Sequence, residues 1–182
     1  MVSHCLESGE PFGIVLRDDD GSARRIGCEA RIEEVIERFE DGRLNIIVAG
    51  ERPFKVLERF EAPGFPAGEI EPIEVGSPAE DDDVDAAELA RTSFAELVSR
   101  VAGEPPEPGE LAGEDSYAIA SRVELPTETK QRLLELRSEA ERMRVLGRAL
   151  RALLNAVSRS EEIAERARMN GKVIVGGPDV VG

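Results

Sequence analysis

The stretch DGRLNIIVAGERPFKV, residues 41–56, decides the fold of this chain. It opens with the dipeptide Asp41-Gly42, which is typical of tight hairpin turns because glycine adopts a positive φ angle at little steric cost. Residues 44–49 follow as a run rich in β-branched side chains, which favour an extended backbone. The stretch therefore predicts a strand that leaves a tight turn.

Two residues interrupt the strand pattern. Gly50 weakens it, and Pro53 has no backbone N–H to donate within a sheet, so it suits a sheet edge or a β-bulge. We therefore expect the strand to stop at Gly50 and another strand to follow over residues 54–60.

The other strand signals lie on both sides of this stretch. Residues 11–17 predict a first strand, and residues 26–39 predict a second, whose alternation of apolar and polar side chains slips at Glu34-Val35, as at a bulge. Prolines and glycines over residues 61–68 predict a loop, and residues 68–75 predict a last strand. Five strands joined by turns rather than helices indicate a mostly antiparallel sheet curled toward a barrel.

Helical periodicity begins near residue 86, loosens after Arg159 and ends near residue 170. Thr127 is expected to cap a helix that ends near residue 136, and Ser138 with Glu141 forms a capping box for the longest helix. Residues 103–113, rich in proline and glycine, predict a mobile surface loop. The helix that begins near residue 86 is expected to bury one face, made of Ala87, Ala90, Phe94, Leu97, Val98 and Val101.

The chain thus predicts an α+β fold in two parts. Residues 1–75 form a small, mostly antiparallel, β-barrel-like lobe, and residues 86–170 form a helical bundle. The acidic segment 76–85 links them, and residues 171–182 are expected to form a disordered tail.

Composition excludes several classes of function. The net charge of −15, from 38 acidic and 23 basic residues, repels a phosphate backbone, so nucleic acid is not an expected partner. No apolar run approaches the roughly 20 residues that cross a bilayer, and the N-terminus lacks the features of a secretion signal, so we expect a cytoplasmic protein with no membrane partner. Cys5 and Cys28 are then expected to be reduced thiols.

Three blocks carry a family resemblance: PFGIVL at residues 11–16, IGCEARI at residues 26–32, and the stretch 41–56. In this order they resemble the N-terminal domain of the ATP-dependent Lon protease and free-standing bacterial proteins made of that domain. The resemblance implies a small irregular β-barrel, capture of substrate polypeptides and a part in subunit contacts. It also implies a non-catalytic module, because Lon proteins cut with a serine and a lysine of a separate C-terminal domain.

The chain departs from this family at its start. Members begin with a proline-rich strand of the form LPLFPL, which this sequence lacks before PFGIVL. We therefore expect an open sheet edge and an uncovered apolar patch, both of which favour association with another chain. Self-association through this edge or through the long helix is one such outcome, and solubility is expected to be lower than for a chain extended upstream.

Motifs for catalysis or cofactor binding are weak. His4 is the one histidine and lies near the terminus, which leaves neither a general base for a nucleophile nor a metal-ligand set. No glycine-rich phosphate or dinucleotide loop is present, and Asp18–Asp20 and Asp81–Asp83 lack the ligand spacing of an ion-binding loop. We expect no catalytic residue, no cofactor and no metal.

Binding through shape is the remaining class of function. Phe60, Phe65 and Pro66 lie in or beside the loop 61–68 and are the candidate contacts for unfolded or partner polypeptides. The simpler interpretation makes the two phenylalanines core residues of a barrel with few aromatic side chains. The sequence leaves open an alternative function, a small-ligand-binding protein or an enzyme with its pocket between the two lobes.

Overall fold

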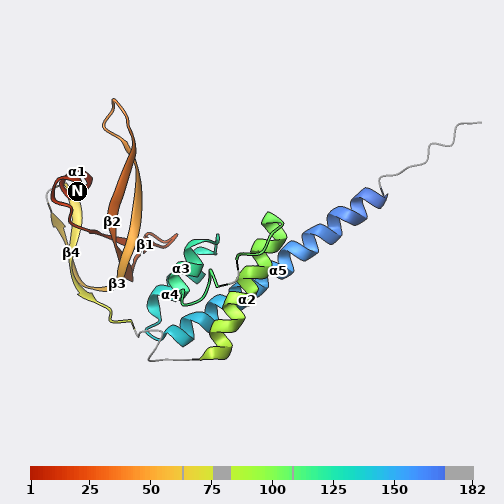
Figure 1. The fold of residues 1–182 in the computed structure, drawn as a ribbon. Coiled ribbons are helices and arrows are strands. Elements are labelled where there is room, and N and C mark those ends of the chain that lie inside the picture. The colour runs from red at the N-terminus through yellow and green to blue at the C-terminus, as the bar shows by residue number, and fades with distance from the viewer. Residues whose placement is uncertain (63, 76–82, 108, 171–182) are drawn as a thin grey trace, which may run out of the picture.

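The computed structural model describes residues 1–62, 64–75, 83–107 and 109–170. A helix and four strands come first, and four helices follow (Figure 1). We call the first five elements the β lobe and the last four the helical lobe. In chain order the elements are α1 (Val2–Ser8), β1 (Phe12–Arg17), β2 (Ala23–Arg38), β3 (Leu44–Ala62), β4 (Phe65–Pro72), α2 (Val84–Ala102), α3 (Ser116–Ser121), α4 (Thr127–Glu135) and α5 (Glu139–Asn170).

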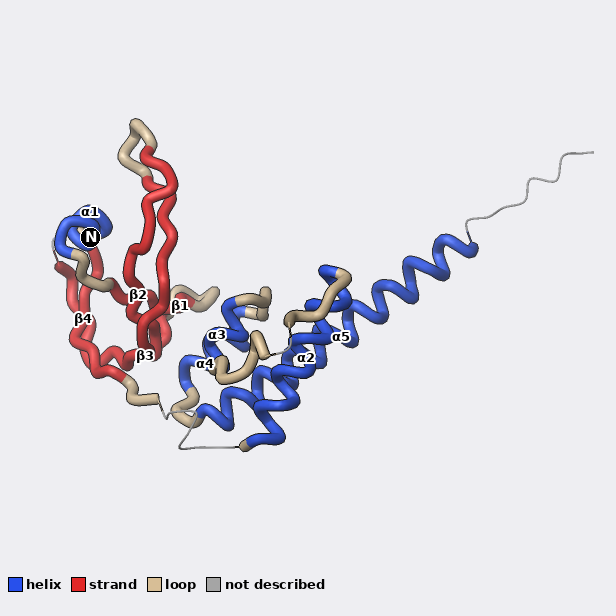
Figure 2. The backbone as a smooth tube through the Cα atoms, viewed as in Figure 1, coloured by secondary structure: helices blue, strands red, loops and turns tan. Residues whose placement is uncertain are grey.

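The four strands form one curled antiparallel sheet in the order β1-β2-β3-β4 (Figure 2). The predicted α+β class, with the sheet first and the helices second, is confirmed. Because β1 and β4 are the outermost strands, each has one edge that pairs with no other strand in the described part of the chain. The described strands therefore form a curled half-barrel.

The prediction of five strands is wrong, because residues 44–60 belong to one strand, β3. Gly50 and Pro53 do not end it: Pro53 pairs with Cys28, and its carbonyl accepts a hydrogen bond from the N–H of Ile73 at 2.9 Å. The register steps from Arg52 to Gly50 and leaves Glu51 as an extra residue. The predicted bulge is present, and it lets the strand continue through the proline.

The predicted loop over residues 61–68 is also wrong in part. Glu61 pairs with Pro66 and Ala62 with Phe65, so β3 and β4 form a tight hairpin there. Gly64, with φ of 92°, supplies the left-handed residue of the turn. The last strand runs from Phe65 to Pro72, whereas the prediction placed it at residues 68–75.

The β2–β3 hairpin agrees more closely with the sequence. Gly42 has φ of 88°, and its N–H donates to the carbonyl of Phe39 at 3.0 Å, as the Asp41-Gly42 dipeptide predicts. The register shifts near Glu34 and Val35 confirm the predicted bulge. This hairpin extends beyond the rest of the sheet in Figure 2.

Helices α2 and α5 pack together and hold the main core of the helical lobe. Ala90 and Phe94 of α2 are buried, as are Leu146 and Leu150 of α5. Gly147 lies at the contact, where an added Cβ would meet the Leu89 side chain at 3.2 Å. The predicted apolar face of α2 is correct except at its end.

Three predictions about the helical lobe need correction, and two about its flanking segments fall outside the described residues. Val101 is 72% exposed, since it lies past the contact with α5. Leu111 is buried against the core, so the predicted surface loop is anchored there. The N-cap of α4 is Pro126, which makes no side-chain cap, and Thr127 is the first helical residue. The predicted tail 171–182 and most of the predicted linker, residues 76–82, lie outside the described residues, so the boundaries of the lobes stay a prediction.

Two helices begin at side-chain caps, and the cap at Ser138 is as predicted from the sequence. The Ser138 hydroxyl accepts the N–H of Glu141 at 3.2 Å at the start of α5, and Asp83 accepts the N–H of Ala86 at 3.1 Å at the start of α2. Beyond its contact with α2, α5 projects outward, with Ile163 exposed (Figure 1).

The two lobes touch through β2 and α4. Gln131 donates from Nε2 to the carbonyl of Ile26 at 3.2 Å, and Arg24 pairs with Glu128 at 2.9 Å. These contacts hold α4 beside the outer face of the sheet. The space between the two lobes lies next to them.

Candidate functional site

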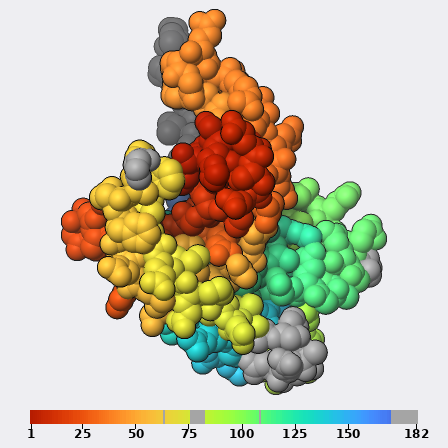
Figure 3. Space-filling model, turned by 90° about the vertical axis from the view of Figure 1, so that its left-hand side faces the viewer, coloured from red at the N-terminus to blue at the C-terminus, as the bar shows by residue number. Residues whose placement is uncertain are grey.

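The concave side of the half-barrel holds an apolar hollow of about 320 Å³, which we call the inner hollow. Phe54 and Val56 of β3 are buried and form its floor, because the sheet curls around them. Residues of α1, β1 and β4 surround them, and Figure 3 shows α1, in red, beside β4, in yellow. The inner hollow therefore lies between the two unpaired sheet edges.

Two of the three predicted contact residues border the inner hollow. Phe65 and Pro66 lie at the start of β4 and line it, whereas Phe60 does not. Phe60 is 54% exposed on β3, so the interpretation that made it a core residue is wrong. Phe65 is half-buried at the rim.

Ionisable groups at the rim of the inner hollow form no catalytic set. His4 and Glu10 contact each other at 3.2 Å in the exposed region near α1. Arg59 donates from Nη2 to the backbone carbonyls of Ala23 and Arg24 at 3.0 and 2.7 Å. The hollow thus offers apolar surface with one cation at one end.

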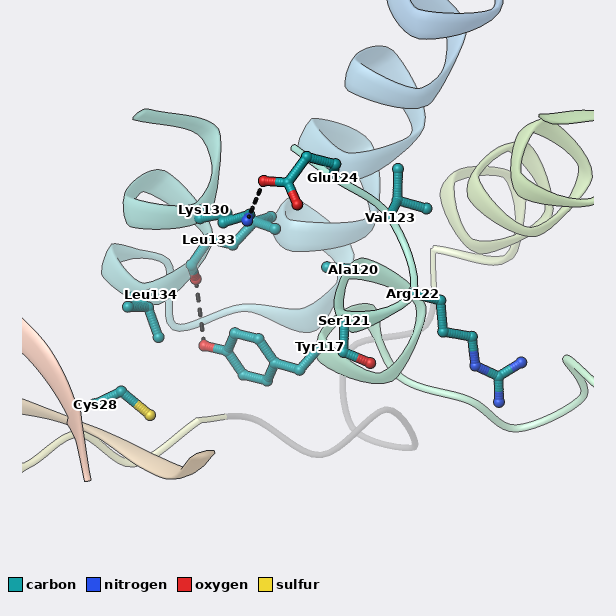
Figure 4. A pocket seen from close by; sticks show the side chains of 10 residues that line it. All are labelled: Cys28, Tyr117, Ala120, Ser121, Arg122, Val123, Glu124, Lys130, Leu133 and Leu134. Atoms are coloured by element: carbon teal, nitrogen blue, oxygen red, sulfur yellow. Dashed lines mark hydrogen bonds and ion pairs between the residues drawn. The ribbon is translucent and has the colours of Figure 1, made fainter. Parts of the chain in front are cut away.

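A larger hollow of about 500 Å³ lies between the lobes, and we call it the interlobe hollow (Figure 4). Cys28 of β2 faces it from the sheet, and Tyr117 of α3 and Leu134 of α4 line it from the helical lobe. The Tyr117 hydroxyl donates to the Leu133 carbonyl at 3.3 Å. The alternative function, a small-ligand-binding protein or an enzyme, requires a pocket between the lobes, and the interlobe hollow is large enough for a small ligand.

The polar groups of the interlobe hollow are poorly suited to nucleophilic or acid–base chemistry. Burial raises the pKa of the Cys28 thiol and also that of the Tyr117 hydroxyl. Both groups are therefore held in their neutral forms, and a neutral thiol is a poor nucleophile. Lys130 pairs with Glu124 at 2.9 Å at the rim. The hollow can hold a ligand, and burial disfavours the anionic forms of Cys28 and Tyr117.

A third hollow, of about 290 Å³, lies on the outer face of β1, and we call it the outer hollow. It lies between β1 and α4 and shares Cys28, Lys130 and Leu134 with the interlobe hollow. Ile14 and Leu16 border it from the strand. Ile14 and Leu16 were not among the predicted site residues, although the run PFGIVL carries apolar side chains at odd and even positions alike, a pattern that indicates a strand covered on both faces.

In the described ranges, no group of three or more His, Cys, Asp or Glu side chains is placed to hold a metal ion. None of the helices in those ranges combines the length and apolar character needed to cross a bilayer.

Solved structures share the fold. A Lon N-terminal domain protein from Xanthomonas campestris aligns with a TM-score of 0.57 at 23% identity, covering 78% of this chain and 77% of that one. The N-terminal domain of the Mycobacterium avium complex Lon protease aligns with a TM-score of 0.57 at 22% identity, covering 81% of this chain and 80% of that one.

Curated relatives agree. The chain is 27% identical over 164 residues to a Lon protease of Anaeromyxobacter dehalogenans, covering 80% of this chain and 19% of that protein. It is 25% identical over 185 residues to a Lon protease of Paraburkholderia phytofirmans, covering 92% of this chain and 22% of that protein. The chain thus spans about a fifth of the length of these relatives. A family model described as the ATP-dependent protease La (LON) substrate-binding domain matches residues 1–152, so the chain belongs to the Lon substrate-binding domain family.

Proposed function

We propose that this chain is a non-catalytic module that binds unfolded segments of other polypeptides, with a role in protein quality control. The observation that carries the proposal is the inner hollow, an apolar space bordered by two unpaired sheet edges. Unfolded segments expose apolar side chains and unpaired backbone groups, and this place in the fold matches both. The family description, a substrate-binding domain, supports the same class of function.

Phe65 and Pro66 are the proposed contacts. Both lie where β4 borders the inner hollow, so an apolar segment in the hollow would cover them. Phe60 lies outside the hollow on the same hairpin. The geometry therefore favours Phe65 and Pro66 over Phe60 as contacts.

Binding to one protein in two states tests the proposal. A reduced and carboxymethylated protein stays unfolded, whereas its disulfide-bonded form is folded, and fluorescence anisotropy reports binding of either. We expect saturable binding of the unfolded form alone. Equal binding of both forms, or of neither, by a folded sample of this chain contradicts the proposal.

A matched pair of variants locates the contact. Phe65→Ser removes an aromatic ring from the rim of the inner hollow and should weaken binding about tenfold, which corresponds to about 1.4 kcal/mol. Phe60→Ser makes the same chemical change outside the hollow and should leave the affinity unchanged. Equal losses for the two variants would remove the inner hollow from the proposal.

The interlobe hollow supports a second candidate function, the binding of a small ligand. Its volume of about 500 Å³ and its apolar lining with a few polar groups are typical of small-molecule sites. A screen of metabolites by thermal shift tests this candidate: a ligand whose stabilisation is lost in Leu134→Asp supports it. Stabilisation that persists in that variant places the ligand elsewhere.

A further inference from the structure

The edge strand β1 has a different hollow on each of its two faces. Phe12 and Gly13 border the inner hollow, Ile14, Leu16 and Arg17 border the outer hollow, and Val15 borders both. Since successive side chains of a strand point to opposite faces, β1 presents side chains to both hollows. The strand pairs with β2 along one edge, and in the described part of the chain no strand pairs with its other edge.

A strand added along this free edge would reach both hollows. Its side chains would alternate between the inner hollow, of about 320 Å³, and the outer hollow, of about 290 Å³. In recognition by strand addition, backbone hydrogen bonds supply affinity and pockets for alternate side chains supply specificity. The edge of β1 that pairs with no described strand offers the backbone hydrogen bonds, and the two hollows beside it offer the pockets.

The charges beside the two hollows have the opposite sign to the chain as a whole. The net charge of the chain is −15, yet the charged side chains that border the two hollows are three cations and one carboxylate, namely Arg17, Arg59, Lys130 and Glu10. Such a local excess of cations attracts a carboxylate from a partner.

Two of these cations, Arg17 and Arg59, have no carboxylate partner among the described residues and can pair with a carboxylate of a bound polypeptide. Among the described residues, neither Arg17 nor Arg59 lies within ion-pair distance of a carboxylate. Arg17 Nη1 donates to the Gly21 carbonyl at 2.9 Å, and Arg59 donates to the Ala23 carbonyl. Since Arg17 also pairs with Ala23 in the sheet, both cations lie at the same end of β1.

We propose that β1 accepts an extended segment of another polypeptide as an added strand, with apolar side chains alternating between the inner and outer hollows and an acidic side chain against Arg17 and Arg59. This inference rests on the proposed function and names the mode and sequence class of its substrate. Because β1 has six residues, the bound segment has about six residues and a length of about 20 Å.

Peptides with blocked ends test the mode of binding. The first pair has six alternating Val and Leu residues with an added glutamate at one terminus or at the other, and the matched pair carries glutamine instead. We expect one glutamate peptide to bind at least tenfold more tightly than its glutamine counterpart. Equal binding of glutamate and glutamine peptides overturns the charge assignment.

N-methylation tests the backbone pairing. Methyl groups on alternate backbone nitrogens remove the donors that face one edge of the peptide and leave its side chains intact. In the tighter glutamate peptide, at least one of the two alternate sets should abolish binding. If the peptides methylated on either set of nitrogens both bind as tightly as the unmethylated peptide, strand addition is overturned.

Variants of the chain locate the site. Ile14→Thr, at a residue 46% exposed in the outer hollow, should weaken the glutamate peptide about tenfold. Leu57→Thr is the control, at a residue 43% exposed that borders neither hollow. The double variant Arg17→Gln, Arg59→Gln should abolish the preference for glutamate, whereas Arg38→Gln, in the β2–β3 hairpin, should keep it. Equal effects of test and control variants, with thermal midpoints unchanged, overturn the site.

The tests also separate this inference from the proposed function. If the unfolded protein binds and the Ile14 and arginine variants bind it as tightly as the unaltered chain, polypeptide binding stands and the β1 assignment fails. If no unfolded protein binds, both fail. If sedimentation shows a dimer that Ile14→Thr dissociates and the peptide does not, the free edge belongs to a second copy and the inference is overturned.

Discussion

Arg142 and Glu139 form a buried ion pair, with Nη2 of the arginine 2.6 Å from Oε2 of the glutamate. Arg142 is 2% exposed, and Nε of its guanidinium donates to the Ser116 hydroxyl at 3.0 Å. The N–H of Ser116 in turn donates to Oε1 of Glu139 at 2.7 Å. This network ties the start of α3 to the start of α5.

Breaking this pair is expected to destabilise the chain strongly. Arg142→Ala leaves the Glu139 carboxylate buried without its counter-charge, which costs about 3–5 kcal/mol. Urea denaturation followed by circular dichroism measures the free energy of unfolding. Arg132→Ala, which removes the exposed partner of the half-buried Glu135, is the control and should cost less than about 1 kcal/mol. Similar losses for the two variants would show that burial of the first pair carries no weight.

Gly147 is expected to be required for the close approach of α2 and α5. In Gly147→Val, the new Cβ lies near the Leu89 side chain at 3.2 Å and its methyl groups lie closer still, so overpacking should cost about 1–3 kcal/mol. Ala152→Val, on an exposed face of α5, is the control for the lower helix propensity of valine, and it should cost less than about 0.7 kcal/mol. Thermal unfolding of both variants compares them; an unchanged melting temperature in Gly147→Val would mean that the helices separate freely.

Asp83 is expected to make stability depend on pH. The hydrogen bond from the N–H of Ala86 and the contact with Arg144 lower the pKa of Asp83 below its ordinary value of 3.8. A lowered folded-state pKa gives stabilisation that is present above the unfolded-state value and is lost as pH falls through the folded-state value. Asp83→Asn keeps a capping oxygen but removes this charge.

The measurement is the difference in melting temperature between the unaltered chain and Asp83→Asn. The unaltered chain should melt at the higher temperature at about pH 6, and the difference should shrink as the pH falls below 3.8 and through the lowered folded-state pKa of Asp83. A difference that stays constant over this range would show that the Asp83 charge contributes nothing.

Cys28 is expected to react slowly with alkylating agents. Its thiol pKa is raised above the ordinary 9.0, mainly by burial, so little thiolate forms near neutral pH. At about pH 8, iodoacetamide should modify Cys28 much more slowly in the folded chain than in urea, as mass spectrometry of the cysteine peptides can show. Modification at equal rates in the two states would reopen a nucleophilic role for the interlobe hollow.

The sequence predicts the fold class because its turn and helix signals are local. The Gly42 turn and the cap at Ser138 depend on residues within a few positions of each other, and they occur where expected. Gly50 and Pro53 predicted a break between two strands, but a bulge at Glu51 accommodates both residues within β3. Whether a strand tolerates a proline depends on its partner strands, which the local sequence does not specify.

The candidate site is less predictable because it depends on which elements meet. The sequence draws attention to Phe60 and Phe65 through their loop-like surroundings, but only the register of the β3–β4 hairpin separates them. Arg142 and Glu139 are spaced like an exposed pair on a helix, and their burial follows from the packing of α3. The outer hollow arises between α4 and the strands β1 and β2, which lie about 100 residues apart from α4 along the chain.

Hydrogen exchange of this chain, with and without a saturating unfolded polypeptide, tests the central claim most directly. The account predicts slower exchange at β1 and β4, which border the inner hollow, and no change at the tip of the β2–β3 hairpin or in the projecting end of α5. Protection confined to either of those two regions, or no protection at saturation, would contradict it.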